Sequence, residues 1–343
     1  LALAERVGDR RGAGWALQHL AWSATTRGDY PLAELMLARA AEVFGALDDD
    51  GGLSWCAGTE AFVRLLQGRI REARDLARGL LPLGRAMGDR WGTGACLAID
   101  GFGAAELGRI STALEETEAS YAEFRDLGDT WGQSMALVAQ GTALRGAGRH
   151  DEATTVLQTA VDISSDAFHP VTGVLALVVL GYCRLDVGDV AGARAAAERA
   201  LAGLARVDLE PGASVGLRVL LAQCLRAEGG LDEALVFLRE AQSWHEGSLL
   251  FPRRQALAHL AGALNESGRS REALAVIGEA FTVPAEDVRS RVVALRVLAQ
   301  CLAGCGDRPA AELAVRQAVA LAQATEMRSE LPASERAMAA LVG

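Results

Sequence analysis

The chain of 343 residues carries a formal net charge of −10, and half of its residues are hydrophobic while only 5% are aromatic. Such an acidic chain is not expected to bind nucleic acid, because nucleic-acid binders usually present a basic face. Apart from five histidines, every basic residue is an arginine, which excludes a P-loop lysine and a Schiff-base lysine from these residues.

Other compositional features argue against membrane and metal binding. The longest apolar run, residues 174–180, is far shorter than the ~20 residues that a membrane-spanning helix needs. The six cysteines form no CxxC pair, and the five histidines form no HExxH motif. We interpret the cysteines as small buried hydrophobic residues in a reducing compartment. These features predict a cytoplasmic protein without a metal or a cofactor.

Along the chain, residues 1–9 align with residues 81–89, where a helix ends. We therefore expect the chain to begin with the end of a preceding repeat, and other domains of a longer chain to come before it. Beyond residue 9, glycine recurs at a nearly constant interval, and alanine follows each of these glycines five positions later. The recurring glycines are Gly28, Gly68, Gly108, Gly148, Gly188, Gly229, Gly268 and Gly306. This period indicates stacked repeat units.

Each unit is expected to be a helical hairpin. In the first, residues 12–26 carry apolar side chains at helical spacing, residues 27–29 interrupt the pattern, and residues 31–44 resume it. Gly28 stands where a C-cap with positive φ is needed, and Pro31 suits the first turn of a helix. Glycine followed by aspartate, as at residues 88–89, ends one unit and offers an N-cap to the next.

The expected architecture is therefore an all-α solenoid, a right-handed superhelix of about eight hairpins. The units are expected at residues 10–47, 48–87, 88–127, 128–167, 168–209, 210–246, 247–285 and 286–328. Residues 329–343 are expected to form a capping helix that covers the last apolar face.

Columns of small residues explain how the two helices of a hairpin can touch. Seven positions before each recurring glycine the first helix carries only alanine or glycine, for example Ala21 and Gly141, and the second helix presents alanines such as Ala33 and Ala153. Both backbones can therefore approach closely. The pattern resembles the tetratricopeptide repeat (TPR), although the unit is longer than the common form of that repeat.

In TPR arrays the first helices line a concave groove, so the resemblance implies that a protein, peptide or small ligand binds there. The residues expected to face this groove are Trp15, Gln18, Trp22, Trp55, Phe62, Phe102, Met135, Tyr182, Gln223, Arg226, Asn265, Arg296 and Gln300.

Two parts of this groove suggest binding chemistry. The column Trp22, Phe62, Phe102 and Tyr182 is expected to be exposed, and exposed aromatic clusters tend to mark binding surfaces. The alternative is that these rings only pack between neighbouring units. The arginines at positions 226 and 296 could hold a carboxylate or phosphate, or they could simply lie on a solvated helix face.

A polar seam is expected through units two to four. Where other units carry leucine on the first helix, these units carry Glu60, Asp100 and Gln140. Buried carboxylates are costly unless paired. Arg64 lies one turn after Glu60, and Arg184 stands at the equivalent position of a later unit. The seam could order the groove, touch a ligand, or be a structural set of ion pairs.

The strings GDRWG at residues 88–92 and GDTWG at residues 128–132 are interpreted as turns that Trp91 and Trp131 pin against the neighbouring unit. These strings, in units of this length, resemble the C-terminal TPR regions of large actinobacterial signalling ATPases and transcriptional regulators. The resemblance implies a non-enzymatic sensor or recognition module within a regulator. An assembly scaffold for protein or self-association is the alternative. An enzyme is not expected, because no nucleophile, base and orienting group fall together.

Overall fold

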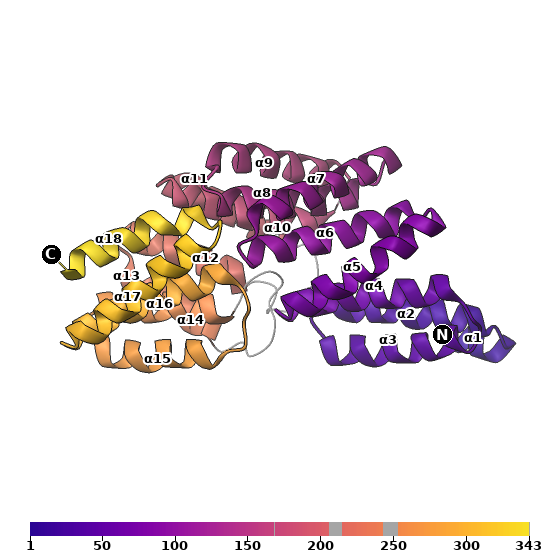
Figure 1. The fold of residues 1–343 in the computed structure, drawn as a ribbon, viewed down its shortest axis with the longest axis horizontal. Coiled ribbons are helices and arrows are strands. Elements are labelled where there is room, and N and C mark those ends of the chain that lie inside the picture. Colours follow the sequence, from indigo (N-terminus) through magenta and orange to yellow (C-terminus); the bar gives the residue numbers. More distant parts are fainter. Residues whose placement is uncertain (168, 206–214, 243–252, 343) are drawn as a thin grey trace.

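The computed structural model describes residues 1–167, 169–205, 215–242 and 253–342. Within these ranges the chain forms α-helices and no strand (Figure 1). The helices are α1 (Ala2–Val7), α2 (Arg10–Thr26), α3 (Tyr30–Gly45), α4 (Asp50–Leu66), α5 (Ile70–Met87), α6 (Arg90–Glu106), α7 (Ile110–Leu127), α8 (Thr130–Gly146), α9 (His150–Asp166), α10 (Pro170–Asp186), α11 (Val190–Leu204), α12 (Val215–Ala227), α13 (Leu231–Gln242), α14 (Arg253–Glu266), α15 (Ser270–Thr282), α16 (Val288–Gly304), α17 (Arg308–Ala324) and α18 (Leu331–Val342), with a short 3-10 helix, η2 (Arg328–Glu330), before α18.

Consecutive helices pack in antiparallel pairs and form a TPR-like solenoid, as the sequence predicted. The pairs run from α2 with α3 to α16 with α17. α18 then covers α17 at the yellow end of the chain (Figure 1). The unit boundaries expected at residues 167–168, 209–210 and 246–247 involve residues outside the described ranges.

The predicted helix ends are confirmed. All eight recurring glycines adopt a positive φ, between 72° and 88°, where a side chain would be strained. At the turn before α6, the Asp89 carboxylate accepts a hydrogen bond from the backbone N–H of Gly92, as an N-cap does. The close approach of paired helices is also present, because a Cβ added at Gly141 of α8 would lie 2.5 Å from Cγ of Leu157.

The last unit folds back onto the second unit, which no sequence pattern indicated. α5 has no side-chain cap at its first turn. Instead, the Glu286 carboxylate, from the segment before α16, accepts hydrogen bonds of 2.7 Å from the backbone N–H of Arg71 and 2.9 Å from its guanidinium. A residue far along the chain therefore caps α5, and its charge lies at the positive end of the helix dipole.

The same contact is repeated one unit later at α7, which also lacks a local side-chain cap. The Glu326 carboxylate, which follows α17, accepts hydrogen bonds of 2.6 Å from the backbone N–H of Ser111 and 3.0 Å from its hydroxyl. The backbone N–H of Glu326 donates to the carbonyl oxygen of Gly108 at 3.0 Å. The two caps together close the solenoid between its second and third units and its last unit (Figure 1).

Replacing Glu326 by alanine should lower the free energy of unfolding by about 1 kcal/mol, because the first turn of α7 loses its only side-chain cap. Urea unfolding gives the measurement. Glu118→Ala is the matched control, since Glu118 is exposed on the same helix and should change stability by less than about 0.5 kcal/mol. Equal urea midpoints for Glu326→Ala and Glu118→Ala would show that the Glu326 contact contributes nothing to stability.

Candidate functional site

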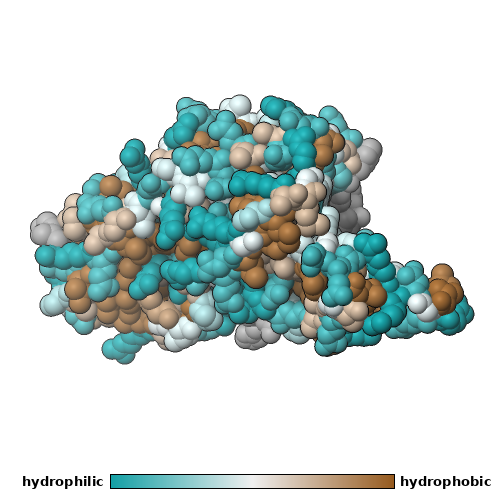
Figure 2. All heavy atoms as spheres, turned by 45° about the vertical axis from the view of Figure 1, so that its right-hand side comes forward, coloured by the Kyte–Doolittle hydropathy of each residue, from teal (hydrophilic) through white to brown (hydrophobic). Residues whose placement is uncertain are grey.

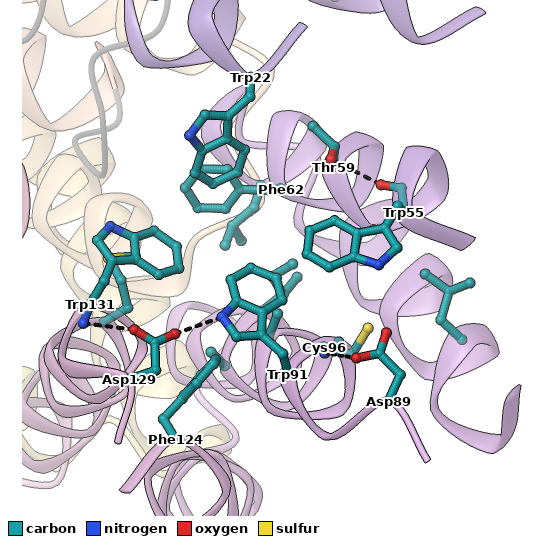
Figure 3. Close-up of a pocket in the computed structure, with 18 of the residues that line it drawn as sticks. Trp22, Trp55, Thr59, Phe62, Asp89, Trp91, Cys96, Phe124, Asp129 and Trp131 are labelled. Atoms are coloured by element: carbon teal, nitrogen blue, oxygen red, sulfur yellow. Dashed lines mark hydrogen bonds between the residues drawn. The ribbon is translucent and has the colours of Figure 1, made fainter. Parts of the chain in front are cut away.

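A cavity of about 480 Å³ opens between the first helices of the first four units, α2, α4, α6 and α8 (Figure 3). It is lined by Gln18, His19, Trp22, Ser54, Trp55, Gly58, Thr59, Phe62, Leu65, Leu80, Asp89, Trp91, Gly92, Ala95, Cys96, Ala98, Ile99, Phe102, Phe124, Asp129, Trp131, Met135, Val138 and Ala139.

The space exists because small residues stand where neighbouring units carry large ones. Ala95 of α6 stands one repeat after Trp55, and Gly58 and Ala98 stand one and two repeats after Gln18. All three small residues line the cavity. Large aromatic side chains surround these small residues, so aromatic rings bound the cavity.

Tryptophans from all four units meet around the cavity, and Figure 3 shows their side chains surrounding an open space. The Trp55 and Trp91 rings stack with centroids 4.8 Å apart, and Trp91 and Trp131 stack at 6.0 Å. Trp22 stacks on Phe62 at 5.5 Å and meets Trp131 edge-on at 5.7 Å. All four indoles are half-buried, so each keeps surface that a ligand could cover.

Phe124 of α7 packs against the tryptophan cluster. Its side chain is 1% exposed and meets the Trp91 ring edge-on, with centroids 5.9 Å apart. Gly94 and Gly132 leave room for the Phe124 ring, because a Cβ at Gly94 would lie 3.1 Å from it and a Cβ at Gly132 would overlap it. The two glycines therefore allow α6, α7 and α8 to close around one buried ring.

Trp91 also holds the turn between units, as the sequence indicated. Its indole Nε1–H donates a 2.6 Å hydrogen bond to Oδ2 of Asp129, whose Oδ1 accepts from the backbone N–H groups of Trp131 and Gly132. The sequence interpretation missed that Trp91 and Trp131 line the cavity as well. The signal was present, since both GDxWG strings place tryptophan in the first turn of a groove-lining helix.

The cavity wall carries carboxylates and no arginine. Asp89 and Asp129 are its acidic residues, and among the lining residues only His19, exposed at the surface, could carry a positive charge. Burial, and then the Asp89 charge, raise the pKa of the Cys96 thiol to about 11. Cys96 is therefore a neutral thiol at pH 7 and not an activated nucleophile.

Six of the predicted groove residues line the cavity: Gln18, Trp22, Trp55, Phe62, Phe102 and Met135. Gln18 is held by a 2.9 Å hydrogen bond from its Nε2 to Oγ1 of Thr59. Trp15 lies next to the cavity without lining it, with its ring edge-on against Phe44 and Trp55 at 5.1 and 6.2 Å.

The expectation of an exposed aromatic column is wrong for Phe102 and Tyr182, which are buried. Trp22 and Phe62 are half-buried, while Phe102 is 9% and Tyr182 4% exposed. The Tyr182 hydroxyl donates to the carbonyl oxygen of Gly216 at 3.1 Å, and the Arg145 guanidinium lies 4.9 Å from the centre of its ring. First helices of successive units pack closely enough for each ring to contact the next unit.

The residues predicted for the polar half of the groove lie away from the cavity and mostly have partners. Arg226 donates to Glu266, and Arg296 donates to Glu330 of η2 at 3.1 Å. The remaining three residues in this half behave differently from one another. Asn265 accepts from the Ser270 hydroxyl, Gln223 hydrogen-bonds Tyr182, and Gln300 is exposed. The two arginines are therefore already neutralised within the fold.

The residues of the expected polar seam fall into separate networks. Arg64 donates to Glu60 at 2.8 Å, as its spacing predicted, and also contacts Glu34. Arg184 instead donates to the carbonyl oxygen of Gly192 at 3.0 Å, and Gln140 is half-buried.

Asp100 forms the second network, between α5 and α6. It is fully buried and accepts from Arg74 at 2.6 Å and from Arg78 at 2.9 Å. Neither Asp100 nor Glu60 lines the cavity, so both networks serve the packing of helices.

The described ranges give no sign of two other kinds of site. They hold no group of three or more histidine, cysteine or acidic side chains placed to bind a metal ion. They also hold no helix with the length and apolar character that crossing a bilayer requires.

Comparison with known proteins places the fold. No protein-family model matches the chain, and no curated protein matches its sequence. A Rap protein complexed with competence and sporulation factor has a similar structure, with a TM-score of 0.59 at 13% identity over 96% of this chain and 98% of that one. The apo form of RapI gives 0.54 at 12% identity, covering 82% and 98% of the two chains.

A third similar structure is human IFIT1, solved as a dimer with m7Gppp-AAAA. Its TM-score is 0.61 at 14% identity, over 94% of this chain and 71% of the human chain. At identities this low the likenesses describe architecture. The chain has a TPR-like helical repeat fold.

Proposed function

We propose that the chain is a non-enzymatic recognition module that binds a protein, peptide or small ligand on its concave side, in the cavity of the first four units. The observation that supports this most is the group of four half-buried tryptophans around an open volume of about 480 Å³. Ligand sites in proteins typically have volumes of ~300–1,000 Å³ and apolar walls with a few polar groups. Tryptophan is also among the residues most enriched at binding hot spots.

A binding role agrees with the chemistry of the wall. Within the described residues the cavity holds one thiol, which is neutral at pH 7, and its aspartates cap helices. This arrangement lacks a nucleophile, a base and an orienting group in mutual contact. The Rap protein of similar fold was solved in complex with competence and sporulation factor, which is consistent with a ligand-binding role for this chain.

The neutral fluorescent probe N-phenyl-1-naphthylamine tests whether the cavity binds apolar molecules. Its emission should rise on binding, and Trp22→Ala or Phe62→Ala should weaken its affinity about tenfold, because each removes a ring of the wall. Phe281→Ala is the control, since Phe281 is an exposed ring on α15 outside the cavity. Unchanged affinity in both wall variants would reject this cavity as the binding site.

We also propose that the module is the regulatory part of a larger signalling ATPase or transcriptional regulator. The support is the resemblance carried by the length of the units and the two GDxWG strings. Coding sequence upstream of Leu1 tests this assignment. A P-loop there agrees with it, whereas an upstream region without an ATPase module contradicts it.

An assembly scaffold is the second candidate, and one observation favours it. Helix α1 buries none of its residues, and Leu3 and Val7 are 64% and 70% exposed. Figure 2 shows hydrophobic atoms gathered at the N-terminal end of the molecule. Exposed apolar patches can mark protein interfaces. Sedimentation at micromolar concentration, with Leu3→Glu as the comparison, would reveal association through this end.

A further inference from the structure

We propose that the tryptophan-lined cavity selects an organic cation, an apolar molecule that carries an ammonium or similar positive group, and that Asp89 is its counter-ion. This rests on the proposed function of the cavity and adds the chemical class of the ligand. Three observations carry it: the charges of the wall, the partners of the two aspartates, and the arrangement of the indole rings.

Negative charge predominates in the cavity wall. It contains two carboxylates, Asp89 and Asp129, and no arginine, although the chain carries 34 arginines in all. The arginines on the nearby turns are paired elsewhere, as Arg11 is with Asp49 and Arg90 is with Glu123. An anionic ligand would therefore meet two like charges and, at the exposed surface, the His19 imidazole, whereas a cation would find a partner.

Asp89 keeps one carboxylate oxygen free for such a partner. The turn aspartates of the neighbouring units use both oxygens: Oδ2 of Asp49 accepts from Arg11, and Oδ2 of Asp129 accepts from the Trp91 indole. The position equivalent to Arg11 and Trp91 is Gly51 in the second unit. Among the described residues, the one donor that reaches the Asp89 carboxylate is the backbone N–H of Gly92, at 2.8 Å on Oδ1.

The helix dipole does not cancel this charge. Asp89 caps α6, whose N-terminus carries an effective charge of about +0.5. A full carboxylate charge exceeds it, so the region stays negative. Asp89 is also half-buried, which weakens screening by solvent and salt.

The aromatic rings complete a cation site. The faces of indole rings are negative and attract cations within about 6 Å. Trp91 and Trp131 are nearly parallel, with an interplanar angle of 13°, but their centroids are 6.0 Å apart. Trp91 also stacks on Trp55, and Trp22 meets Trp131 edge-on. A cation would therefore contact the parts of these half-buried faces that the neighbouring rings do not cover. In Figure 3, Asp89 lies on the side of the cavity where Trp55 and Trp91 face each other.

The experiment compares two probes of the same shape, the cation phenyltrimethylammonium and its neutral analogue tert-butylbenzene. Their affinities are measured by tryptophan emission with the wild-type chain, Asp89→Asn and Asp49→Asn. Asparagine caps helices about as well as aspartate, so both variants should fold. Asp49→Asn is the matched control, since it removes the same charge from the equivalent turn outside the cavity.

We expect the cation to bind more tightly than the neutral probe, and Asp89→Asn to weaken the cation about tenfold without changing the neutral probe. Asp49→Asn should leave both affinities unchanged. Equal binding of the two probes, with no effect of Asp89→Asn, would overturn the cation preference and leave the cavity as an apolar ligand site. Binding of neither probe would overturn the cation inference. N-phenyl-1-naphthylamine would then decide separately whether the cavity binds ligands at all.

Discussion

Replacing Asp100 by alanine should lower the free energy of unfolding by about 3–5 kcal/mol, because it leaves a buried guanidinium without its counter-charge. Asp100 has no exposed side-chain surface, and Arg74 has 4%. Arg74 cannot turn to solvent, since its stem packs against Gly103, where an added Cβ would lie 2.7 Å from Cγ of Arg74. Arg78 is 45% exposed and can regain water. Urea unfolding followed by tryptophan emission reports this loss.

The double variant Asp100→Leu with Arg74→Met provides the control for this result. Removing both charges and keeping apolar volume is often neutral or stabilising, so its stability should return to within about 1 kcal/mol of the wild type or exceed it. The affinity for N-phenyl-1-naphthylamine should not change, because neither residue lines the cavity. If Asp100→Leu alone were as stable as the wild type, Asp100 would not be needed to compensate Arg74.

Replacing Phe124 by alanine should cost about 3–5 kcal/mol of stability and also weaken ligand binding. The ring is 1% exposed and lies against Trp91. Its loss leaves a hole beneath the tryptophan cluster, between Gly94 and Gly132, neither of which has a side chain to fill it. We expect Trp91 to move into the space that the Phe124 ring leaves. The affinity for N-phenyl-1-naphthylamine should then fall at least tenfold at temperatures where the variant is folded.

Phe44 is a matched control because it repeats the same packing in the first unit. Its side chain is fully buried, it meets Trp15 at 5.1 Å, and Cβ atoms added at Gly14 and Gly52 would crowd it. Phe44→Ala should therefore cost as much stability as Phe124→Ala. Phe44 does not line the cavity, so probe affinity should be kept. Equal losses of affinity in both variants would mean that general loosening, not the support of Trp91, governs binding.

Local patterns in the sequence were sufficient to predict the helices, their ends and their pairing. A glycine such as Gly28 ends a helix because its own backbone adopts a positive φ, and an aspartate such as Asp9 caps the helix that follows it directly. These interactions join residues a few positions apart and recur along the array. The pairing of Arg64 with Glu60 could be predicted for the same reason, since one helical turn separates them.

The candidate site could be predicted only in part. Trp22, Trp55 and Phe62 were found because they recur on first helices, and recurrence is visible in the sequence. The place of Trp91 and Trp131 in the same wall depends on how far each unit rotates against the next. That rotation brings Trp91 between Trp55 and Trp131, and no single unit encodes it.

The sequence by itself determined the repeat, the hairpins and a negatively charged chain. Only the tertiary structure decided where the groove is open and where it is filled. Small rotations between units add up along the solenoid until Glu286 and Glu326 cap helices 215 residues earlier in the chain. Tyr182, Arg226 and Arg296 consequently contact other parts of the fold, and the space between the first four units stays open. Such contacts between distant residues depend on the sum of all the packing angles, which local sequence does not specify.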